Sequence, residues 1–139
     1  PENRAYYSQD FKDLLTGSVP EWKISENEVS VASDAFSRLK GVGVWVRKWS
    51  FSHRGLQIVD FINGTGYRQI DRYFQTMFKP EFVGDSIICG PVRIIGAKKA
   101  IFSSISYWSG YGKAQEAYSI RISSKEKLPF SGLLNIDLK

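Results

Sequence analysis

Asp60 stands in the middle of the apolar run Ile58-Val59-Asp60-Phe61-Ile62, which is typical of a buried β-strand. Burying a carboxylate costs free energy unless the group is paired or hydrogen-bonded. Three roles fit such a residue: a metal ligand, a catalytic acid, or a structural anchor. The anchor role predicts that Asp60 is buried and that it accepts hydrogen bonds from the Asn63–Gly66 turn or pairs with an arginine such as Arg47.

Few other residues have types and spacings that are typical of catalysis. The sole histidine, His53, falls in an expected turn, and the sole cysteine, Cys89, falls in an apolar run typical of a core. A zinc site needs three or four donors, and one histidine and one cysteine supply too few of them. The sequence contains no phosphate-binding loop, dinucleotide fingerprint or nucleophile elbow. We therefore predict no catalytic residue, no metal site and no cofactor in this chain.

Two segments combine aromatic and basic residues in a way that could bind a partner. In the first, Trp45, Arg47 and Trp49 alternate along an expected strand and share one of its faces, with Lys48 between them. The second is the aromatic and glycine-rich run 107–113, which contains Trp108. Aromatic rings beside cations suit sugar rings and acidic groups. They equally suit a sheet face that packs against another domain.

The charge balance also allows an anionic partner. The chain of 139 residues carries a net charge of +5, which suits a nucleic acid, a polyanionic glycan or a membrane surface. Most surpluses of positive charge of this size reflect only basic side chains that are exposed to solvent. The sequence signatures of nucleic-acid-binding folds are missing, and no apolar run approaches the roughly 18 residues of a membrane span. We expect neither a nucleic-acid partner nor a membrane span.

The elements that must position these residues are β-strands. Short aromatic and β-branched runs separated by turn residues predict strands at Glu28–Ser33, Val42–Phe51, Gly55–Ile62, Gly66–Phe78, Asp85–Cys89, Val92–Ile95, Ala100–Tyr107, Gln115–Ser123 and Phe130–Asp137. Short turns at 52–55 and 63–66 predict an antiparallel meander of the three strands between residues 42 and 78. The middle strand is apolar on both faces, so we expect it to be central.

Many strands at a spacing of about ten residues predict an all-β, antiparallel β-sandwich. The length favours a single domain over residues 1–139, with segment 1–27 at its periphery. Tyr7, Phe11, Leu14 and Leu15 recur with helical spacing before Gly17, which predicts one short N-terminal helix.

Five stretches, taken in order, resemble the C-terminal β-sandwich domain of the heparinase II/III family. They are Asp34-Ala35-Phe36-Ser37-Arg38-Leu39-Lys40-Gly41, Val44-Trp45-Val46-Arg47-Lys48, Gly55-Leu56-Gln57-Ile58-Val59-Asp60, Gly64-Thr65-Gly66 and Phe78-Lys79-Pro80. That family commonly shows an Asp-Gly-Tyr-x-Arg-Leu stretch, a His-Arg-Arg-type strand and an Ile-Ile-Asp strand. A Gly-x-Gly turn and a Trp-His-x-x-Pro-like pattern follow. The resemblance covers roughly residues 34–80.

The resemblance implies that this chain is the C-terminal part of a larger polysaccharide lyase, in a periplasmic or extracellular location. Catalytic residues would then lie in an N-terminal α/α-toroid of the same protein. This domain would be non-catalytic, would brace the toroid and would help to form a cleft for an anionic, uronate-containing polysaccharide. The expected substrate contacts are Trp45, Arg47, Lys48, Trp49, Arg68, Arg72 and Trp108. The alternatives are a free-standing carbohydrate-binding or adhesion module and a purely structural sandwich.

The chain departs from the family pattern where some members bind a structural metal through two histidines and an aspartate. Asp60 falls at the aspartate position, but the histidine positions fall on Trp45 (or on Val46, one residue later) and on Met77. Phe36 likewise replaces the usual tyrosine and Ala35 the usual glycine. The resemblance therefore implies the family's fold without its metal, and it leaves the anchor role for Asp60.

Overall fold

The structure, a computed structural model, describes residues 20–97 and 99–138 and contains eleven strands there. The strands are β1 (Glu21–Ile24), β2 (Glu28–Ser33), β3 (Val42–Ser52), β4 (Gly55–Gly64), β5 (Tyr67–Thr76), β6 (Glu81–Val83), β7 (Ser86–Cys89), β8 (Val92–Ile95), β9 (Ala100–Gly110), β10 (Lys113–Lys127) and β11 (Phe130–Leu138). These residues form no helix, so none of them could cross a membrane as a helix. The short N-terminal helix expected over residues 7–15 lies outside the described residues.

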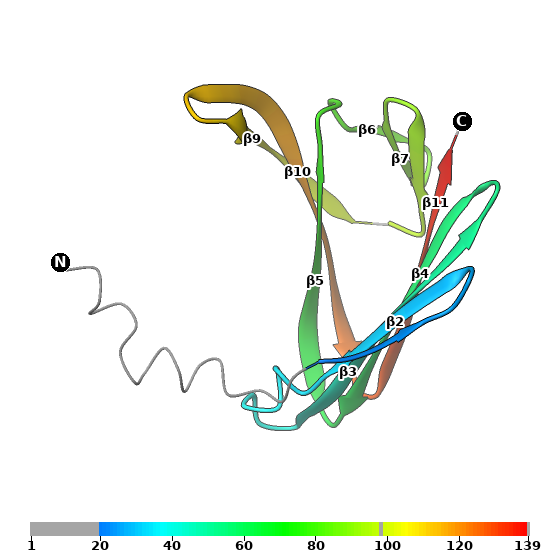
Figure 1. Ribbon diagram of the computed structural model, residues 1–139. Coiled ribbons are helices and arrows are strands. Elements are labelled where there is room, and N and C mark those ends of the chain that lie inside the picture. The colour runs from blue at the N-terminus through cyan, green and yellow to red at the C-terminus, as the bar shows by residue number, and fades with distance from the viewer. Residues whose placement is uncertain (1–19, 98, 139) are drawn as a thin grey trace, which may run out of the picture.

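The strands form two antiparallel sheets, as Figure 1 shows. The larger sheet has eight strands in the order β1-β2-β3-β4-β11-β8-β7-β6, and the smaller has three in the order β5-β10-β9. The expected all-β, antiparallel sandwich is confirmed. The strand β4 lies between β3 and β11, so its expected central position is confirmed as well.

The expected three-stranded meander is wrong in its last step. A hairpin joins β3 to β4 as expected, with His53 in its turn, but β5 pairs with β10 in the other sheet. The chain crosses between the sheets at residues 64–66, where Gly64 and Gly66 take positive φ angles of 137° and 81°. Glycine adopts such angles without a Cβ clash, so Gly residues between two strands fit a crossing as well as a hairpin.

The main core lies between the small sheet and the β7, β8 and β11 side of the large sheet. Its fully buried residues include Ile87 and Leu134 from the large sheet and Ile120 from β10. Each such side chain contributes about 1.5–3 kcal/mol by leaving water. Cys89 belongs to this cluster, which confirms its interpretation as a small core residue. The strands β1, β2 and β3 contribute no residue to this cluster.

Candidate functional site: a charged pocket between the sheets

A pocket of about 460 Å³ opens between the β3–β4 hairpin of the large sheet and β5 of the small sheet. The link between β2 and β3, residues 34–41, contributes Phe36 and Leu39 to one side of it. Its wall is formed by Phe36, Leu39, Val42, Trp45, Arg47, Asp60, Ile62, Arg68, Gln69, Ile70, Asp71, Arg72, Tyr73 and Leu128. The pocket therefore combines apolar and aromatic walls with the charged side chains of Arg47, Asp60, Arg68 and Arg72.

Asp60 is the most buried of these charged groups, with 2% of its side chain exposed. The register of the hairpin places Arg47 directly opposite Asp60. Arg47 donates from Nε to Oδ1 (2.7 Å) and from Nη2 to Oδ2 (3.0 Å), and Trp45 Nε1 donates to Oδ1 at 3.2 Å. The prediction that Asp60 is buried and paired with an arginine is confirmed.

A second arginine reaches the same carboxylate from the other sheet. Arg72, on β5, donates from Nε to Asp60 Oδ2 at 2.6 Å and is itself almost fully buried. One carboxylate thus joins strands of both sheets across the sandwich. Because two guanidinium groups share one carboxylate, this cluster keeps a net positive charge.

The pairing decides the protonation of Asp60. Burial alone would raise the pKa of this carboxyl, but hydrogen bonds and charge from Arg47, together with Arg72, hold the pKa below its usual value. Asp60 is therefore ionised at neutral pH, and both of its oxygens accept hydrogen bonds. A carboxylate in this state anchors its neighbours and is poorly suited to donate a proton.

Gly132 on β11 provides the space that Arg72 occupies. Gly132 pairs with Asp60 in the sheet, and a Cβ at this position would clash with Arg72 Nη2 and with the ring of Phe130. Nη2 is buried without a hydrogen-bond acceptor among the described residues. The Arg72 guanidinium lies over the Phe130 ring, 5.6 Å from its centroid, and this cation–π contact partly compensates for the missing acceptor.

Arg68 lies in the same wall and is held differently. Its guanidinium donates to the backbone carbonyls of Tyr67, at 2.7 Å, and of Lys40. Neither acceptor is charged, so these bonds position the guanidinium without neutralising it. The nearby carboxylate of Asp71 has partners of its own, since it accepts a hydrogen bond from Ser123 (2.6 Å) and pairs with Arg121 at 3.8 Å.

Trp45, Arg47 and Trp49 on β3 form a ladder of alternating aromatic and cationic side chains, as their spacing in the sequence predicts. The Arg47 guanidinium carbon lies 5.3 Å from the centroid of the Trp45 ring and 5.9 Å from that of Trp49, which confirms their common face. Trp22 on β1 stacks on Trp49, with ring centroids 6.4 Å apart and planes 5° apart. Phe36 meets Trp45 edge to face. The ladder therefore extends from the pocket wall toward the edge strand β1.

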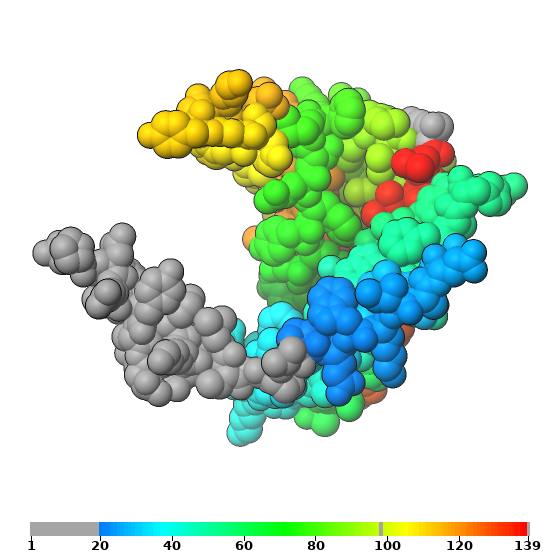
Figure 2. All heavy atoms as spheres, in the orientation of Figure 1, coloured from blue at the N-terminus to red at the C-terminus, as the bar shows by residue number. Residues whose placement is uncertain are grey.

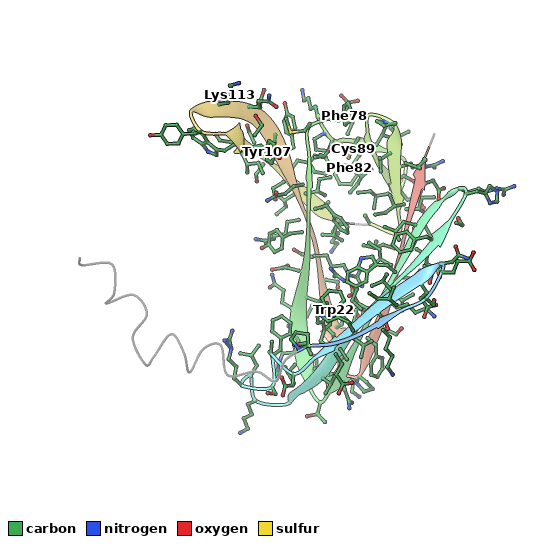
Figure 3. The ribbon with its side chains drawn as sticks, viewed as in Figure 1. Trp22, Phe78, Phe82, Cys89, Tyr107 and Lys113 are labelled. Atoms are coloured by element: carbon green, nitrogen blue, oxygen red, sulfur yellow. The ribbon has the colours of Figure 1, made fainter. Side chains whose placement is uncertain are left out.

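The structure brings four of the seven predicted contact residues to the pocket: Trp45, Arg47, Arg68 and Arg72. Trp49 lies next along the same face. Lys48 alternates to the opposite face of the sheet, where it pairs with Glu28 at 2.5 Å. Trp108 is near the tip of the β9–β10 hairpin. Its neighbour along the chain, Tyr107, lies far from Trp22 in Figure 3.

Sequence reasoning missed several wall residues, of which Phe36 and Tyr73 carry the most aromatic surface. In the sequence, Phe36 stands out only as a replacement for a tyrosine of the family pattern. The role of Arg72 as a partner of Asp60 was also missed. A clue was present, since Arg72 alternates with Ile70 and Phe74 on one face of its strand, and an inward-facing arginine needs an acidic partner.

Asp60 has guanidinium and indole donors around it in place of further metal ligands. Among the described residues, no group of three or more histidine, cysteine or carboxylate side chains is placed to hold a metal ion. Met77, at the second histidine position of the family pattern, follows β5 and is 45% exposed.

Fold and pocket together define an antiparallel, two-sheet β-sandwich with a cationic, aromatic-walled pocket between its sheets. No protein-family model matches the sequence, and no curated protein matches it either. Among solved structures, the fold is similar to that of a mutant of heparan sulfate lyase HepC from Pedobacter heparinus, with a TM-score of 0.57 and 12% sequence identity. The match covers 88% of this chain and 21% of that one, so this chain spans about a fifth of the lyase's length. At this identity the likeness establishes a shared fold.

Proposed function

We propose that this chain is a non-catalytic sandwich domain of a heparinase II/III-like polysaccharide lyase. In this proposal it braces an N-terminal α/α-toroid and contributes one wall of a cleft for an anionic, uronate-containing polysaccharide. The likeness of its fold to a sandwich-sized part of a heparan sulfate lyase supports this interpretation. The observation that carries it is the pocket, in which the cationic side chains of Arg47, Arg68 and Arg72 lie beside the rings of Phe36 and Trp45.

The pocket offers the two kinds of contact that an acidic sugar needs. Phe36 and Trp45 present ring surface, on which the apolar face of a sugar can stack. Arg68 keeps an uncompensated guanidinium, which suits a carboxylate or sulfate through charge-assisted hydrogen bonds. Arg47 adds positive charge, although its Nε and Nη2 already bind Asp60. Arg68 is therefore the main anion contact in this proposal, and Arg72 serves mainly to hold Asp60.

Titration calorimetry of the chain with heparan sulfate, alginate and a neutral glucan, at two salt concentrations, tests the proposal. We expect binding to the two acidic polymers only, and weaker binding at high salt because exposed charges are screened. Arg68→Gln should weaken binding at least about tenfold, since a charge-assisted hydrogen bond contributes about 1.5–3 kcal/mol. The matched control is Arg93→Gln, which removes the same charge from an exposed site on β8.

Each other outcome favours a different role. Undetectable binding to all three polymers would leave only a structural role. Equal binding of the neutral glucan would favour a general carbohydrate-binding module. Equal losses in Arg68→Gln and Arg93→Gln would indicate attraction by net charge alone. Formation of an unsaturated uronate by this chain, seen as new ultraviolet absorbance, would overturn its non-catalytic assignment.

A further inference from the structure

The strand β9 forms one edge of the small sheet and pairs only with β10 among the described strands. It is eleven residues long, with the sequence AIFSSISYWSG, and contains no charged residue and no proline. Ile101, Tyr107 and Trp108 on this strand are 57%, 49% and 63% exposed. In Figure 2 the β9–β10 hairpin projects from the rest of the surface. A long, uncharged edge strand presents unpaired backbone groups to which another strand can add.

The three other sheet edges in the described part of the chain are blunted. β1 has four residues, of which Glu21 and Lys23 are charged, and β6 has three residues, including Glu81. β5 is longer but carries Arg68, Asp71 and Arg72. Short length and charge are common means by which proteins prevent pairing at sheet edges. β9 lacks both.

We propose that β9 is a strand-addition site for a second copy of this chain, with the two β9 strands antiparallel across a twofold axis. Each small sheet would then become half of a continuous six-stranded sheet. The proposal is independent of polysaccharide binding, because the pocket lies at β3, β4 and β5.

The chemistry of the strand favours a second copy as the occupant. Along β9 a self-pairing opposes no like charges and places serine, β-branched and aromatic side chains across from one another, which stabilises antiparallel pairs. A twofold contact also uses the same edge of both copies. Because the other described edges are blunted, association should stop at a dimer.

Sedimentation of the chain over micromolar to millimolar concentrations tests this inference. We expect the mass to rise from 15.8 kDa to twice that value. Hydrogen exchange should slow in β9 amides as the dimer forms, while exchange in β5 stays unchanged. A monomer at all concentrations, or a dimer without protection of β9, would overturn the proposal.

Two lysine variants make the test specific. Ser103 on β9, Ser119 on β10 and Gln75 on β5 lie in one row across the small sheet. Ser103→Lys places a charge on the uncharged edge and should weaken dimerisation at least about tenfold. Gln75→Lys places the same charge in the same row at the opposite edge and should leave dimerisation unchanged. Equal effects of the two substitutions would assign the loss to net charge and contradict pairing through β9.

Discussion

Tryptophan side chains at the two ends of the molecule are held by different means. On β3, Trp45 and Trp49 flank the guanidinium of Arg47, and Trp45 also donates to Asp60. On β9, Trp108 is 63% exposed on a strand with no charged residue. In the sequence, the segments 45–49 and 107–113 both combine aromatic and basic residues. On β3, the carboxylate of Asp60 on the neighbouring strand holds the guanidinium of Arg47 in place. The guanidinium in turn orders the rings of the two tryptophans beside it.

Removal of that carboxylate should give the largest effect. Asp60→Asn leaves Arg47 and Arg72 in a buried site without their counter-ion, so we expect the free energy of unfolding to fall by about 3–5 kcal/mol. The matched control is Asp71→Asn, which weakens a more exposed pair and should cost about 1 kcal/mol or less. Urea denaturation measures both. Similar losses in the two variants would show that the buried cluster is no stronger than a surface pair.

Acid should weaken the same cluster. The folded-state pKa of Asp60 is lowered, so its contribution to stability is present above the unfolded value of about 3.9. That contribution is lost as the pH falls through the folded pKa. The difference in stability between the wild type and Asp60→Asn should therefore stay constant from neutral pH to about pH 5 and narrow below about pH 4. Urea denaturation at a series of pH values tests this, and narrowing already above pH 5 would contradict it.

Filling the space beside the cluster should have an intermediate effect. Gly132→Ala introduces a Cβ that clashes with Arg72 and Phe130, and overpacking of this kind costs about 1–3 kcal/mol. Gly110→Ala, at the end of β9, meets no atom within 4 Å and should change stability by about 0.5 kcal/mol or less. Thermal denaturation distinguishes the two. An unchanged midpoint for Gly132→Ala would mean that Arg72 can move aside freely.

Truncation of the tryptophans compares the two ends directly. Trp49→Ala loses the stack with Trp22 and the contact with Arg47, for an expected cost of about 1–2 kcal/mol. Trp108→Ala should cost about 0.5 kcal/mol or less when measured on the monomer at low concentration. Equal losses of stability in the two variants would contradict the view that Trp49 is held by its neighbours and Trp108 is not.

The fold class was predictable from the sequence because turn residues separate β-branched and aromatic runs at regular intervals. Nine of the strands lie near their predicted positions. β1 and β6 were missed because each has only three or four residues and mixes charged with apolar ones. The pairing of β5 was predicted wrongly, since a glycine-rich turn fits a hairpin and a crossing between sheets equally well. Sheet membership is a non-local property that a single turn does not encode.

The candidate site was predictable in part. The burial of Asp60 and its pairing with Arg47 follow from local sequence, because an aspartate in an apolar strand needs a partner and a hairpin places Arg47 opposite it. The contribution of Arg72 depends on how the two sheets face one another, and that of Gly132 depends on Arg72. Both are consequences of tertiary packing, which strand patterns alone do not specify.

The sharing of one carboxylate by both sheets restricts how this protein can change over evolutionary time. Replacement of Asp60 by an apolar residue would leave the buried Arg72 and the partly buried Arg47 without a counter-ion, and replacement of Arg72 by a small residue would leave space beside Gly132 unfilled. Each single change is harmful, whereas a joint exchange of all the partners could restore a packed interior. Positions 47, 60, 72 and 132 should therefore vary together among relatives, as one inherited unit.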